Sequence, residues 1–572
     1  MHRPSLLHAM GAVVALVAVL ACTEDPVRSV ESEALTPAAP VLASASVPPA
    51  ASLSVKVTVP ASMRSSPFNV DRFLTIPPNF SIAVYARISG ARFMATAPNG
   101  DLLVSNPGAG SVYLVRASTT GGDPTVSTWA SGLYKPHDIV FHTIDGVTWV
   151  YVAEADKIAR YTYNSASATG QGRQVLITGL PSLSTPELQG GYGHELKNIA
   201  LDNANKLYVS IASTCNVCLS DTQSNPVRAS VYVYNADGTG GRIFARGLRN
   251  AEGLAMVPGT NVLWVVVNNR DNIAYSFQND WDGDGTNDYK KVMQSYVDNH
   301  PPEEFTKVRD GGNYGWPFCN PNPDSPSGMN GMPFDRDVEQ NADGSRLDCA
   351  TADRISKGIQ AHSAPLGVTF LQGTNAPAEY REGVMVPLHG SWNRSSRTGA
   401  KLIYFAWDAV SQLPDQQIDL VSGWLVSGSY WGRPVDAAVG TDGGIYISDD
   451  QSGTIYKLSY AAPPPPLAPP PPPPTNNPPV ASFTWSCPGL TCTLDASSST
   501  DDGQIVLYSW NLGRFPNPVA TGRVVSATYP HEGNRSVVLT VTDNGDASNS
   551  IARTVVVGAS PPPPPPLSLI HI

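Results

Sequence analysis

The chain has 572 residues, of which 41% are hydrophobic and 15% are charged, and its formal net charge is −11. Its 52 prolines and 49 glycines are far more than helices tolerate, and they favour strands joined by turns. The acidic balance, without a clustered basic face, argues against a nucleic-acid partner because phosphate binding requires such a face.

The N-terminal segment has the features of an export signal. Arg3 supplies a basic start, and residues 10–20 form an apolar stretch that is short for a membrane-spanning helix. The stretch ends in Val19-Leu-Ala-Cys22, which resembles the lipobox of bacterial lipoproteins. We therefore expect residues 1–21 to be a signal peptide, Cys22 to be lipidated, and the protein to be exported and lipid-anchored to the bacterial cell envelope. A plain secretory signal with a chance cysteine is the alternative.

Residues 22–66 are rich in Ala, Ser, Pro and Val without a sustained period, and they are predicted to form a flexible tether. Residues 67–460 then carry six repeats of a short phrase. Most repeats lead through a turn into an alternating strand such as Lys206-Leu-Tyr-Val-Ser. The repeats begin at Arg92, Pro136, His194, Arg249, His362 and Arg433. Such a pattern is typical of a β-propeller, so we predict an all-β fold with a six-bladed propeller.

The spacing between Arg249 and His362 is about twice the others. A degenerate seventh blade is one explanation. Residues 270–350 are full of Asn, Asp, Gly and Pro, however, which favours inserted loops. The alternating segment from Ser81 to Arg87 is expected to pair with the last blade and close the ring.

The innermost strand of every propeller blade starts at the central channel. The repeats therefore predict a ring of cationic and basic side chains around one pocket. The side chains in question are those of Arg92, His137, Asp138, His194, Arg249, Asn250, His362 and Arg433.

Six of the seven cysteines fall into local sets, namely Cys215 with Cys218, Cys319 with Cys349, and Cys487 with Cys492. An exported protein is expected to oxidise such pairs to disulfides. Leu219 follows Cys218 where a c-type haem attachment site requires His, and no second CxxC or His pair supports a zinc site. We predict a small disulfide loop at Cys215–Cys218.

The C-terminal part begins with a run of prolines, so residues 461–477 are predicted to be an extended linker. Residues 478–558 resemble a PKD domain, a small immunoglobulin-like β-sandwich, in phrases such as Tyr508-Ser-Trp-Asn and Val537-Val-Leu-Thr-Val-Thr-Asp-Asn. A second proline run opens residues 559–572 and leads to no further domain, so we expect this tail to be truncated.

The propeller phrases together resemble the soluble PQQ-dependent sugar dehydrogenases, in particular the sorbosone and pyranose dehydrogenase-like branch. The phrases include Gly193-His-Glu-Leu-Lys-Asn, Gly247-Leu-Arg-Asn250, Gly311-Gly-Asn-Tyr-Gly-Trp-Pro317, Leu388-His-Gly-Ser-Trp-Asn-Arg394 and Trp431-Gly-Arg-Pro. PQQ is a flat quinone with three carboxylates, and arginine binds carboxylates in bidentate fashion. The resemblance implies that Arg92, Arg249, Asn250, His362, Arg394 and Arg433 bind this cofactor.

The resemblance also implies that His194 is the general base that takes the sugar hydroxyl proton. Lys197 stands where relatives commonly show Arg, and Val435 stands where other branches carry a further Arg. Turn-stabilising roles remain an alternative for His137, Asp138 and His362. His389 and Trp392 lie in a family phrase, but the sequence does not show which of them faces the pocket.

Calcium is predicted at two places. The resemblance implies one Ca²⁺ on the quinone, held largely by backbone carbonyls near Asn269-Arg270-Asp271. A second site is indicated by Asp280, Asp282, Asp284 and Asp288, whose spacing is that of a calcium loop. Lys291 occupies the position of the last carboxylate ligand, so a solvated acidic turn is the alternative.

We therefore expect an extracytoplasmic PQQ- and Ca²⁺-dependent dehydrogenase that oxidises a sugar or sugar aldehyde and passes electrons to an external acceptor. Its membrane contact would be the lipid anchor, and the PKD domain would contact a glycan or a protein. One alternative is a catalytically inactive propeller that binds surface glycans. Another is a calcium-dependent lactone hydrolase, which would place carboxylate and Asn ligands in the channel instead of arginines.

Overall fold

A computed structural model describes residues 46–461, 476–514 and 518–558. The chain divides into two compact units, with the boundary at Pro463 and Pro464. The predicted signal peptide, the lipidation site at Cys22, the proline runs and the C-terminal tail lie outside the described residues. Among the helices that are described, none has the length and hydropathy needed to cross a membrane.

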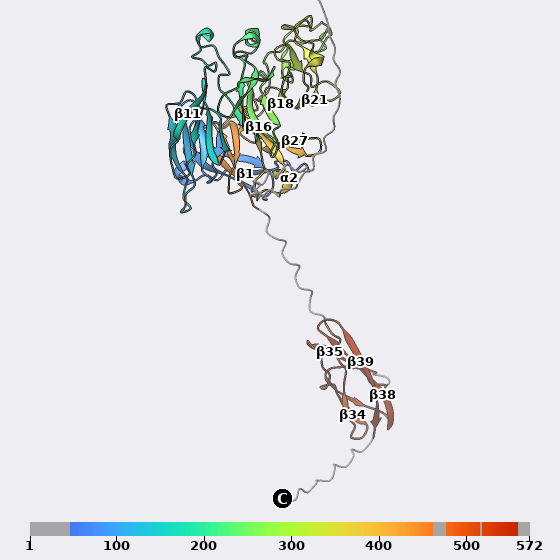
Figure 1. Cartoon of the computed structure of the whole chain (residues 1–572). Helices are drawn as coiled ribbons and strands as arrows, with labels where there is room; N and C mark the ends of the chain where they lie inside the picture. Colours follow the sequence, from blue (N-terminus) through green and yellow to red (C-terminus); the bar gives the residue numbers. More distant parts are fainter. Residues whose placement is uncertain (1–45, 462–475, 515–517, 559–572) are drawn as a thin grey trace, which may run out of the picture. The chain divides into compact units, whose positions relative to one another are not determined.

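Within residues 46–461, the first unit contains six sheets of four or five strands (Figure 1). The first sheet consists of β4 (Met94–Thr96), β5 (Leu102–Asn106), β6 (Ser111–Arg116) and β7 (Thr125–Ser131). The second consists of β8 (Ile139–Ile144), β9 (Val147–Ala153), β10 (Lys157–Thr162) and β11 (Gln171–Thr178). The third consists of β12 (Ile199–Leu201), β13 (Lys206–Ile211), β14 (Ser230–Asn235), β15 (Arg242–Arg246) and β19 (Gly312–Asn313).

The other three sheets follow in chain order. The fourth consists of β16 (Ala251–Met256), β17 (Leu263–Val267), β18 (Glu303–Val308), β23 (Ile355–Ile359) and β21 (Asn330–Met332). The fifth consists of β24 (Thr369–Phe370), β25 (Gly383–Leu388), β26 (Lys401–Asp408) and β27 (Leu413–Val421). The sixth consists of β30 (Pro434–Val439), β31 (Ile445–Asp449), β32 (Thr454–Tyr460) and β3 (Phe80–Arg87).

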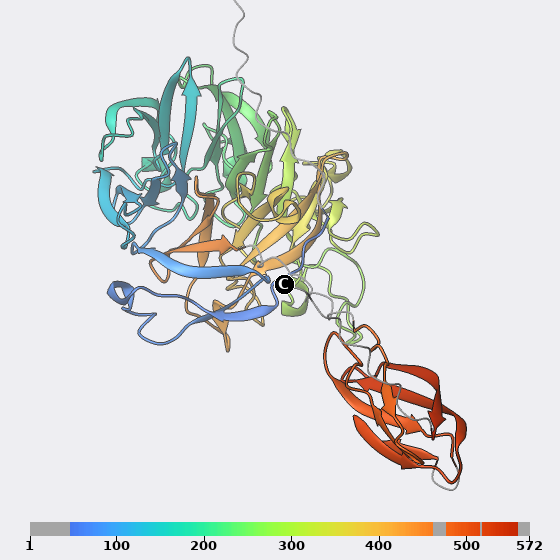
Figure 2. The ribbon, with the colours of Figure 1, turned by 90° about the horizontal axis from the view of Figure 1, so that it is seen from below.

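These sheets succeed one another around the unit, as the sequence of colours in Figure 2 shows. Their first strands contact each other in order: β4 contacts β8, β8 contacts β12, β12 contacts β16, β24 contacts β30, and β30 contacts β4. Between the fourth and fifth sheets, Gly253 lies so close to the next sheet that a Cβ there would be 2.3 Å from the carbonyl oxygen of Leu366. The all-β propeller class predicted from the repeats is confirmed.

The ring is closed by pairing between the two ends of the propeller segment. Strand β3 runs antiparallel to β32, with Phe80 opposite Tyr460 and Arg87 opposite Thr454. Its alternating burial follows its alternating sequence. This pairing confirms the predicted closure, and it covers an edge that would otherwise be open.

The long spacing between the fourth and fifth repeats consists of insertions into the fourth sheet. The loop between β17 and β18 carries the short helix α1 (Gln294–Val297). A longer insertion separates β18 from β23 and contains β19, β20 (Cys319–Pro321), β21, β22 (Phe334–Arg336) and η4 (Cys349–Thr351). The inserted-loop prediction is therefore confirmed, and a disulfide between Cys319 and Cys349 ties the longer insertion together.

The predicted tether is too long at its C-terminal end. Strand β1 (Leu53–Lys56) pairs with β2 (Phe73–Ile76), and the hydroxyl of Tyr380 donates a hydrogen bond to the Pro49 carbonyl at 2.9 Å. Val57 and Phe68 are buried in the propeller core. Residues 46–66 thus belong to the propeller unit, because alternate apolar residues in this segment cover its outer surface. The remaining short elements of the unit are η1 (Ala61–Met63), η2 (Pro186–Leu188), η3 (Leu219–Gln223), α2 (Ala378–Arg381), β28 (Leu425–Val426) and β29 (Ser429–Tyr430).

Apolar side chains fill the spaces between neighbouring sheets. Between the fourth and fifth sheets, the rings of Trp264 and Trp407 meet edge to face at 5.2 Å, and Phe305 stacks on Phe405 at 5.5 Å. Removing one such buried aromatic ring costs about 3–5 kcal/mol. These contacts hold the sheets, and hence the loops at their ends, in fixed relative positions.

Two equivalent buried aspartates also join neighbouring sheets. Asp138 accepts a hydrogen bond from the Ile199 backbone N–H at 2.9 Å, and Asp436 accepts one from Met94 N–H at 2.8 Å. Burial raises the pKa of both carboxyls, that of Asp436 to about 7. Asp138 therefore joins two sheets, a structural role that differs from the turn-stabilising alternative considered for this residue.

The second unit is a sandwich of two sheets. One contains β33 (Thr484–Ser486), β34 (Thr491–Asp495) and β37 (Val524–Thr528), and the other contains β36 (Val519–Thr521), β35 (Ile505–Asn511), β38 (Gly533–Asp543) and β39 (Ser548–Val557). Trp510 is fully buried between them, and its indole N–H donates to the Gly522 carbonyl at 2.8 Å. The disulfide Cys487–Cys492 and the predicted sandwich are both confirmed.

Candidate functional site

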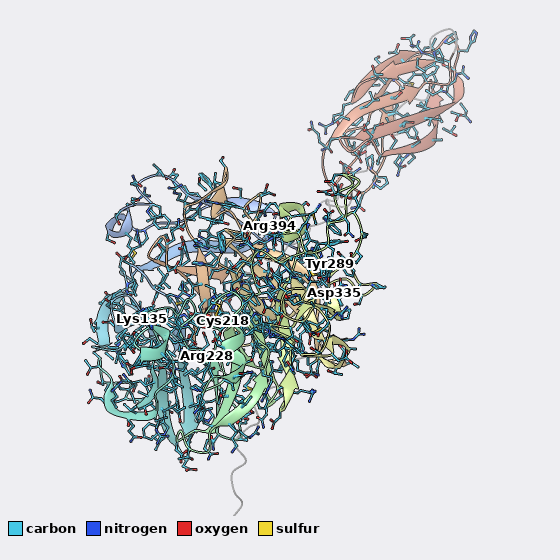
Figure 3. The ribbon with its side chains drawn as sticks, turned by 90° about the horizontal axis from the view of Figure 1, so that it is seen from above. Lys135, Cys218, Arg228, Tyr289, Asp335 and Arg394 are labelled. Atoms are coloured by element: carbon cyan, nitrogen blue, oxygen red, sulfur yellow. A yellow bond between two sulfur atoms is a disulfide. The ribbon has the colours of Figure 1, made fainter. Side chains whose placement is uncertain are left out.

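The candidate site lies at the end of the propeller where the first strands of the sheets begin. His194 lies in the loop that leads into β12, Arg249 in the loop that leads into β16, and Arg433 directly before β30, so their loops meet at this end. Figure 3 views the molecule from above and labels Cys218, Arg228 and Arg394 on surrounding loops. The repeat thus brings side chains together that lie far apart in the sequence.

His194 is held through one ring nitrogen. Its Nδ1 lies 2.9 Å from the Ser213 carbonyl oxygen and 3.2 Å from the Ser213 hydroxyl. Burial and the nearby charge of Arg249 lower the pKa of His194 to about 4. The imidazole is therefore neutral at pH 7, with Nδ1 as the donor to Ser213 and Nε2 as the basic nitrogen.

Arg249 is buried beside His194 and its guanidinium is fully oriented. Nε donates to the Asn216 carbonyl at 3.1 Å, Nη2 donates to the Asn216 side-chain oxygen at 3.0 Å, and Nη1 donates to the Asn268 carbonyl at 3.2 Å. Asp271 lies 3.7 Å from Nη2. Because a buried cation needs such partners, this network fixes a positive charge at the site.

Asp271 also faces His362. The Nδ1 atom of His362 lies 3.5 Å from Asp271 Oδ1, and its Nε2 donates to the Val297 carbonyl at 2.8 Å. Burial alone would lower the pKa of His362, but the hydrogen bond to Asp271 and the charge of Glu303 outweigh burial and raise it. His362 therefore orients Asp271, and both of its ring nitrogens have partners.

A second charged group contains Arg92 and Arg433. Arg92 forms an ion pair with Asp450 at 2.7 Å, and His389 Nε2 lies 2.9 Å from the other oxygen of Asp450. Arg433 donates to the backbone carbonyl of His389 at 2.8 Å and also to that of Gly390. Burial opposes ionisation of Asp450, but its hydrogen bond to His389 and the charges of His389 and Arg92 hold the pKa of Asp450 well below its usual range.

The floor of the site is polar and buried. The amide of Asn250 donates to Glu252 at 3.1 Å, and burial raises the pKa of Glu252. Lys197 is fully buried, donates to the Pro181 carbonyl at 2.9 Å, and has a pKa that burial lowers to about 7. Buried atoms without a partner among the described residues include His137 Nδ1, Asn198 Oδ1 and Glu252 Oε2. Such atoms are satisfied by ordered water or a ligand.

The loop that carries Arg394 borders the site rather than filling it. Arg394 donates to the backbone carbonyls of Asp298 and Ala361, and so anchors the loop next to His362. Asn393 reaches Asp271 at 3.4 Å. Trp392, directly before Asn393, is 71% exposed and points to solvent.

The segment Asn269–Asp271 offers oxygen ligands for a cation. The hydrogen bonds of the described residues leave the carbonyls of Asn269 and Arg270 without a donor, whereas the carbonyl of Asp271 accepts from Asn216 at 2.9 Å. The Arg270 side chain turns away and pairs with Asp337 and Glu339. These residues fit the Ca²⁺ predicted here, since Ca²⁺ binds carbonyl oxygens and the carbonyls of two residues are available.

The acidic loop brings fewer carboxylates together than its sequence indicated. Oxygen atoms of Asp280, Asp282 and Asp288 lie within 4.8 Å of one another, the one such group of three among the described residues. Asp284 lies outside the group, and its carboxylate accepts the Thr286 N–H at 2.7 Å in a local turn. Lys291 forms an ion pair with Asp288 at 2.9 Å.

Two residues that contribute to the site were not identified from the sequence. Asn216 contacts both Arg249 and Asp271, and its position inside the Cys215–Cys218 disulfide loop was the available signal. Asp450 joins Arg92 to His389, and its place directly after β31 at the channel end could have indicated it.

Fold and site define a β-propeller protein whose channel end is lined by arginine, histidine and carboxylate side chains. Residues 75–461 match the TrAA12-like family, and residues 476–557 match the PKD domain. Because the first match covers more than half of the sequence, this chain belongs to the TrAA12-like family.

Among curated proteins, an uncharacterized protein of Borreliella burgdorferi is 38% identical over 103 residues, which are 18% of this chain and 27% of that protein. The pyrroloquinoline quinone-dependent pyranose dehydrogenase of Coprinopsis cinerea is 25% identical over 355 residues, which cover 53% of this chain and 44% of that protein. The chain thus spans less than half the length of either relative.

Two solved structures share the fold. The holo form of the pyranose dehydrogenase PQQ domain from Coprinopsis cinerea is 20% identical with a TM-score of 0.54, and the match covers 68% of this chain and 97% of that one. The calcium structure of Trichoderma reesei Carbohydrate-Active Enzymes Family AA12 is 18% identical, also with a TM-score of 0.54, over 68% of this chain and 97% of that one.

Proposed function

We propose that this protein is an exported, PQQ- and calcium-dependent sugar dehydrogenase that is anchored to the cell envelope through lipid on Cys22. The observation that carries the proposal is the environment of His194, a neutral imidazole fixed through Nδ1 beside a buried arginine. The family membership and the name of the Coprinopsis cinerea relative support sugar oxidation.

The side chains around the channel end fit a flat, polycarboxylate cofactor. Arg92, Arg249 and Arg433 supply three cations there, and Arg249 is rigidly oriented by Asn216. The unpartnered buried atoms of the floor indicate space for a polar group or water. When bound, PQQ would supply the quinone that accepts the hydride from the sugar carbon, with Ca²⁺ at the carbonyls of Asn269 and Arg270.

His194 would remove the proton of the sugar hydroxyl. The O–H bond would break as Nε2 takes the proton, its electron pair would form the carbonyl, and the carbon that bore the hydroxyl would give its hydride to the quinone of bound PQQ. The Nδ1–H group keeps its hydrogen bond to the Ser213 carbonyl, and this bond holds the orientation of the ring during the transfer. The carboxylate of Asp271 favours the imidazolium that results, since its charge raises the pKa of His194.

The decisive experiment is a PQQ titration of the full chain, with and without Ca²⁺, followed by a panel of aldoses and sugar aldehydes with an artificial acceptor. We expect tight, calcium-dependent binding and bleaching of the quinone absorbance by substrate. Arg249→Ala should weaken binding, whereas the exposed Arg354→Ala, which lies away from the site, should not. Absence of PQQ binding would refute the proposal and favour a glycan-binding propeller.

A further inference from the structure

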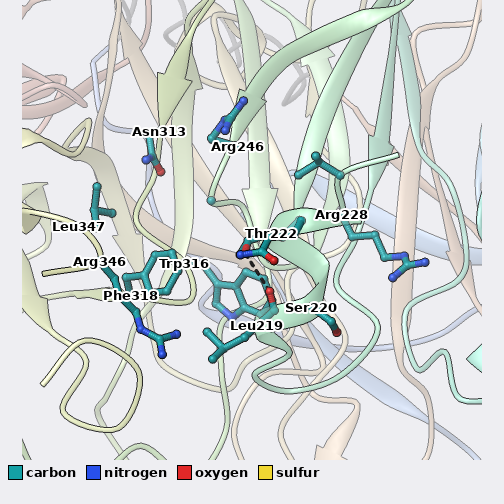
Figure 4. Close-up of a pocket in the computed structure, with 14 residues that line it drawn as sticks. Leu219, Ser220, Thr222, Arg228, Arg246, Asn313, Trp316, Phe318, Arg346 and Leu347 are labelled. Carbon is teal, nitrogen blue, oxygen red and sulfur yellow. Dashed lines mark hydrogen bonds between the residues drawn. The ribbon is translucent and has the colours of Figure 1, made fainter. Parts of the chain in front are cut away.

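A cavity of about 630 Å³ lies beside the candidate site, where η3 and its neighbouring loop face the segment around Trp316 (Figure 4). Its apolar wall is formed by Trp316, Phe318, Leu219 and Leu347. The ring of Phe318 is half-buried, and Figure 4 shows it next to Trp316. None of these residues takes part in the sugar oxidation proposed above.

Two of the three arginines that line this pocket have no ion-pair partner within 4.0 Å in the described part of the chain. These are Arg246 and Arg346, and both are exposed. Arg228 differs, because it is buried and pairs with Asp221 at 3.1 Å. Two free guanidinium groups at the edge of an aromatic wall favour a ligand that is both negatively charged and aromatic.

One residue connects the pocket to the candidate site. The carbonyl of Asn216 accepts a hydrogen bond from the Trp316 indole N–H at 3.4 Å and another from Arg249 Nε at 3.1 Å. The Cys215–Cys218 disulfide encloses Asn216 and restricts its loop. A ligand on Trp316 would therefore be separated from the Arg249 side of the site by little more than this loop.

We propose that the pocket binds an anionic aromatic electron acceptor, separately from the sugar. The inference rests on the proposed function, because a quinone cofactor that the sugar has reduced must pass its electrons to an oxidant before the next turnover. Regeneration of the oxidised cofactor transfers two electrons and two protons to the acceptor, which is reduced. Separate sites let the acceptor bind while the sugar occupies the region of His194.

The first test measures binding without the cofactor. Equilibrium dialysis of the cofactor-free full chain would use the anionic dye 2,6-dichlorophenolindophenol as the probe. We expect micromolar binding that weakens with added salt. Arg246→Ala combined with Arg346→Ala should weaken it about tenfold or more, Arg→Lys at both positions should restore part of it, and Arg354→Ala should leave it unchanged. Equal binding by wild type and the double alanine variant would overturn the proposal.

The second test uses the enzyme loaded with PQQ and Ca²⁺. The double alanine variant should raise KM for the anionic dye about tenfold, with KM for the sugar and for the cationic acceptor phenazine methosulfate unchanged. An equal effect on both acceptors would refute a charge-selective pocket. Arginine-dependent dye binding by a chain that oxidises no sugar would refute the proposed function and, with it, the assignment of the ligand as an electron acceptor.

Discussion

The carbonyl oxygen of Ser213 lies 2.9 Å from Nδ1 of His194, and this contact decides which ring nitrogen carries the proton. A carbonyl oxygen only accepts hydrogen bonds, so Nδ1 must be the donor and Nε2 keeps its lone pair. The partner of a histidine determines its tautomer, and here it leaves Nε2 free to act as a base. A backbone carbonyl also cannot be removed by substitution at position 213.

Replacing His194 by Ala is expected to lower kcat/KM for the sugar by about 10²–10⁴-fold, because the proton acceptor is lost. Cofactor affinity should change little, since no cofactor-binding role is assigned to His194. Steady-state kinetics and a PQQ titration measure the two effects. His142→Ala is the matched control, as His142 lies at an exposed hydrogen bond with Asn205. Retention of wild-type kcat/KM in His194→Ala would show that another group is the base.

The low pKa of His194 makes a prediction about pH. With a pKa of about 4, the imidazole stays unprotonated down to mildly acidic pH. The kcat/KM of the loaded enzyme should therefore hold as pH falls through the normal histidine range of about 6.5, and it should drop only as pH approaches the lowered pKa. A pH–rate profile measures this, and an acidic limb near the normal value would contradict the burial argument.

Asp271→Asn should lower the pKa of His362, because the hydrogen bond and the charge that raise it are weakened. A histidine whose pKa is higher in the folded state than in the unfolded state stabilises the fold at pH values below the unfolded pKa. This stabilisation is lost as the pH rises through the folded pKa. The variant should therefore lose additional stability on the acidic side. It should also lose about 3 kcal/mol at all pH values, because the buried Arg249 loses its neighbouring carboxylate.

Chemical denaturation at several pH values, with an NMR titration of His362, measures both effects of Asp271→Asn. Asp310→Asn is a suitable control, since Asp310 forms an exposed ion pair with Arg242. An unchanged His362 titration would mean that Glu303 or burial alone controls this histidine.

The disulfide Cys319–Cys349 joins residues 30 apart in the long insertion. Replacing both cysteines by Ala should destabilise the insertion by about 3 kcal/mol, because the unfolded segment gains chain entropy. Limited proteolysis should then cut within residues 320–348 sooner than elsewhere, while the second unit keeps its melting temperature. Unchanged protease resistance would show that packing alone holds the insertion.

Terbium luminescence tests the acidic loop as a metal site. Trp281 is 37% exposed, and its backbone N–H contacts Asp288, so its indole can sensitise Tb³⁺ bound by Asp280, Asp282 and Asp288. Lys291→Glu should increase the affinity about tenfold, because it replaces an ammonium with the missing carboxylate. Asp282→Ala should abolish the signal. Luminescence that is absent, or insensitive to both variants, would identify a solvated acidic turn.

Much of the fold was predictable because it is periodic. The repeats that begin at Arg92 and Arg433 each specify a turn followed by an alternating strand, and this pattern can be recognised from a short segment of sequence. The boundary of the tether was missed, because β1 is short and exposed on one side, and its pairing with β2 depends on residues about 20 positions away. The pairing of β3 with β32 was predictable only from the general rule that a propeller pairs its first and last strands and so leaves no open sheet edge there.

The sequence by itself determined the residue types at the channel end, the three local disulfides and the two folded units, because each rests on spacing within a short segment. Tertiary structure decided how those side chains are used. Only folding brings Asp271 between Arg249 and His362, places Asp450 between Arg92 and His389, and puts Asn216 between the site and a second pocket. Most of those partners lie at the ends of different sheets, as His362 and Asp271 do, and contacts between sheets leave no periodic trace in the sequence.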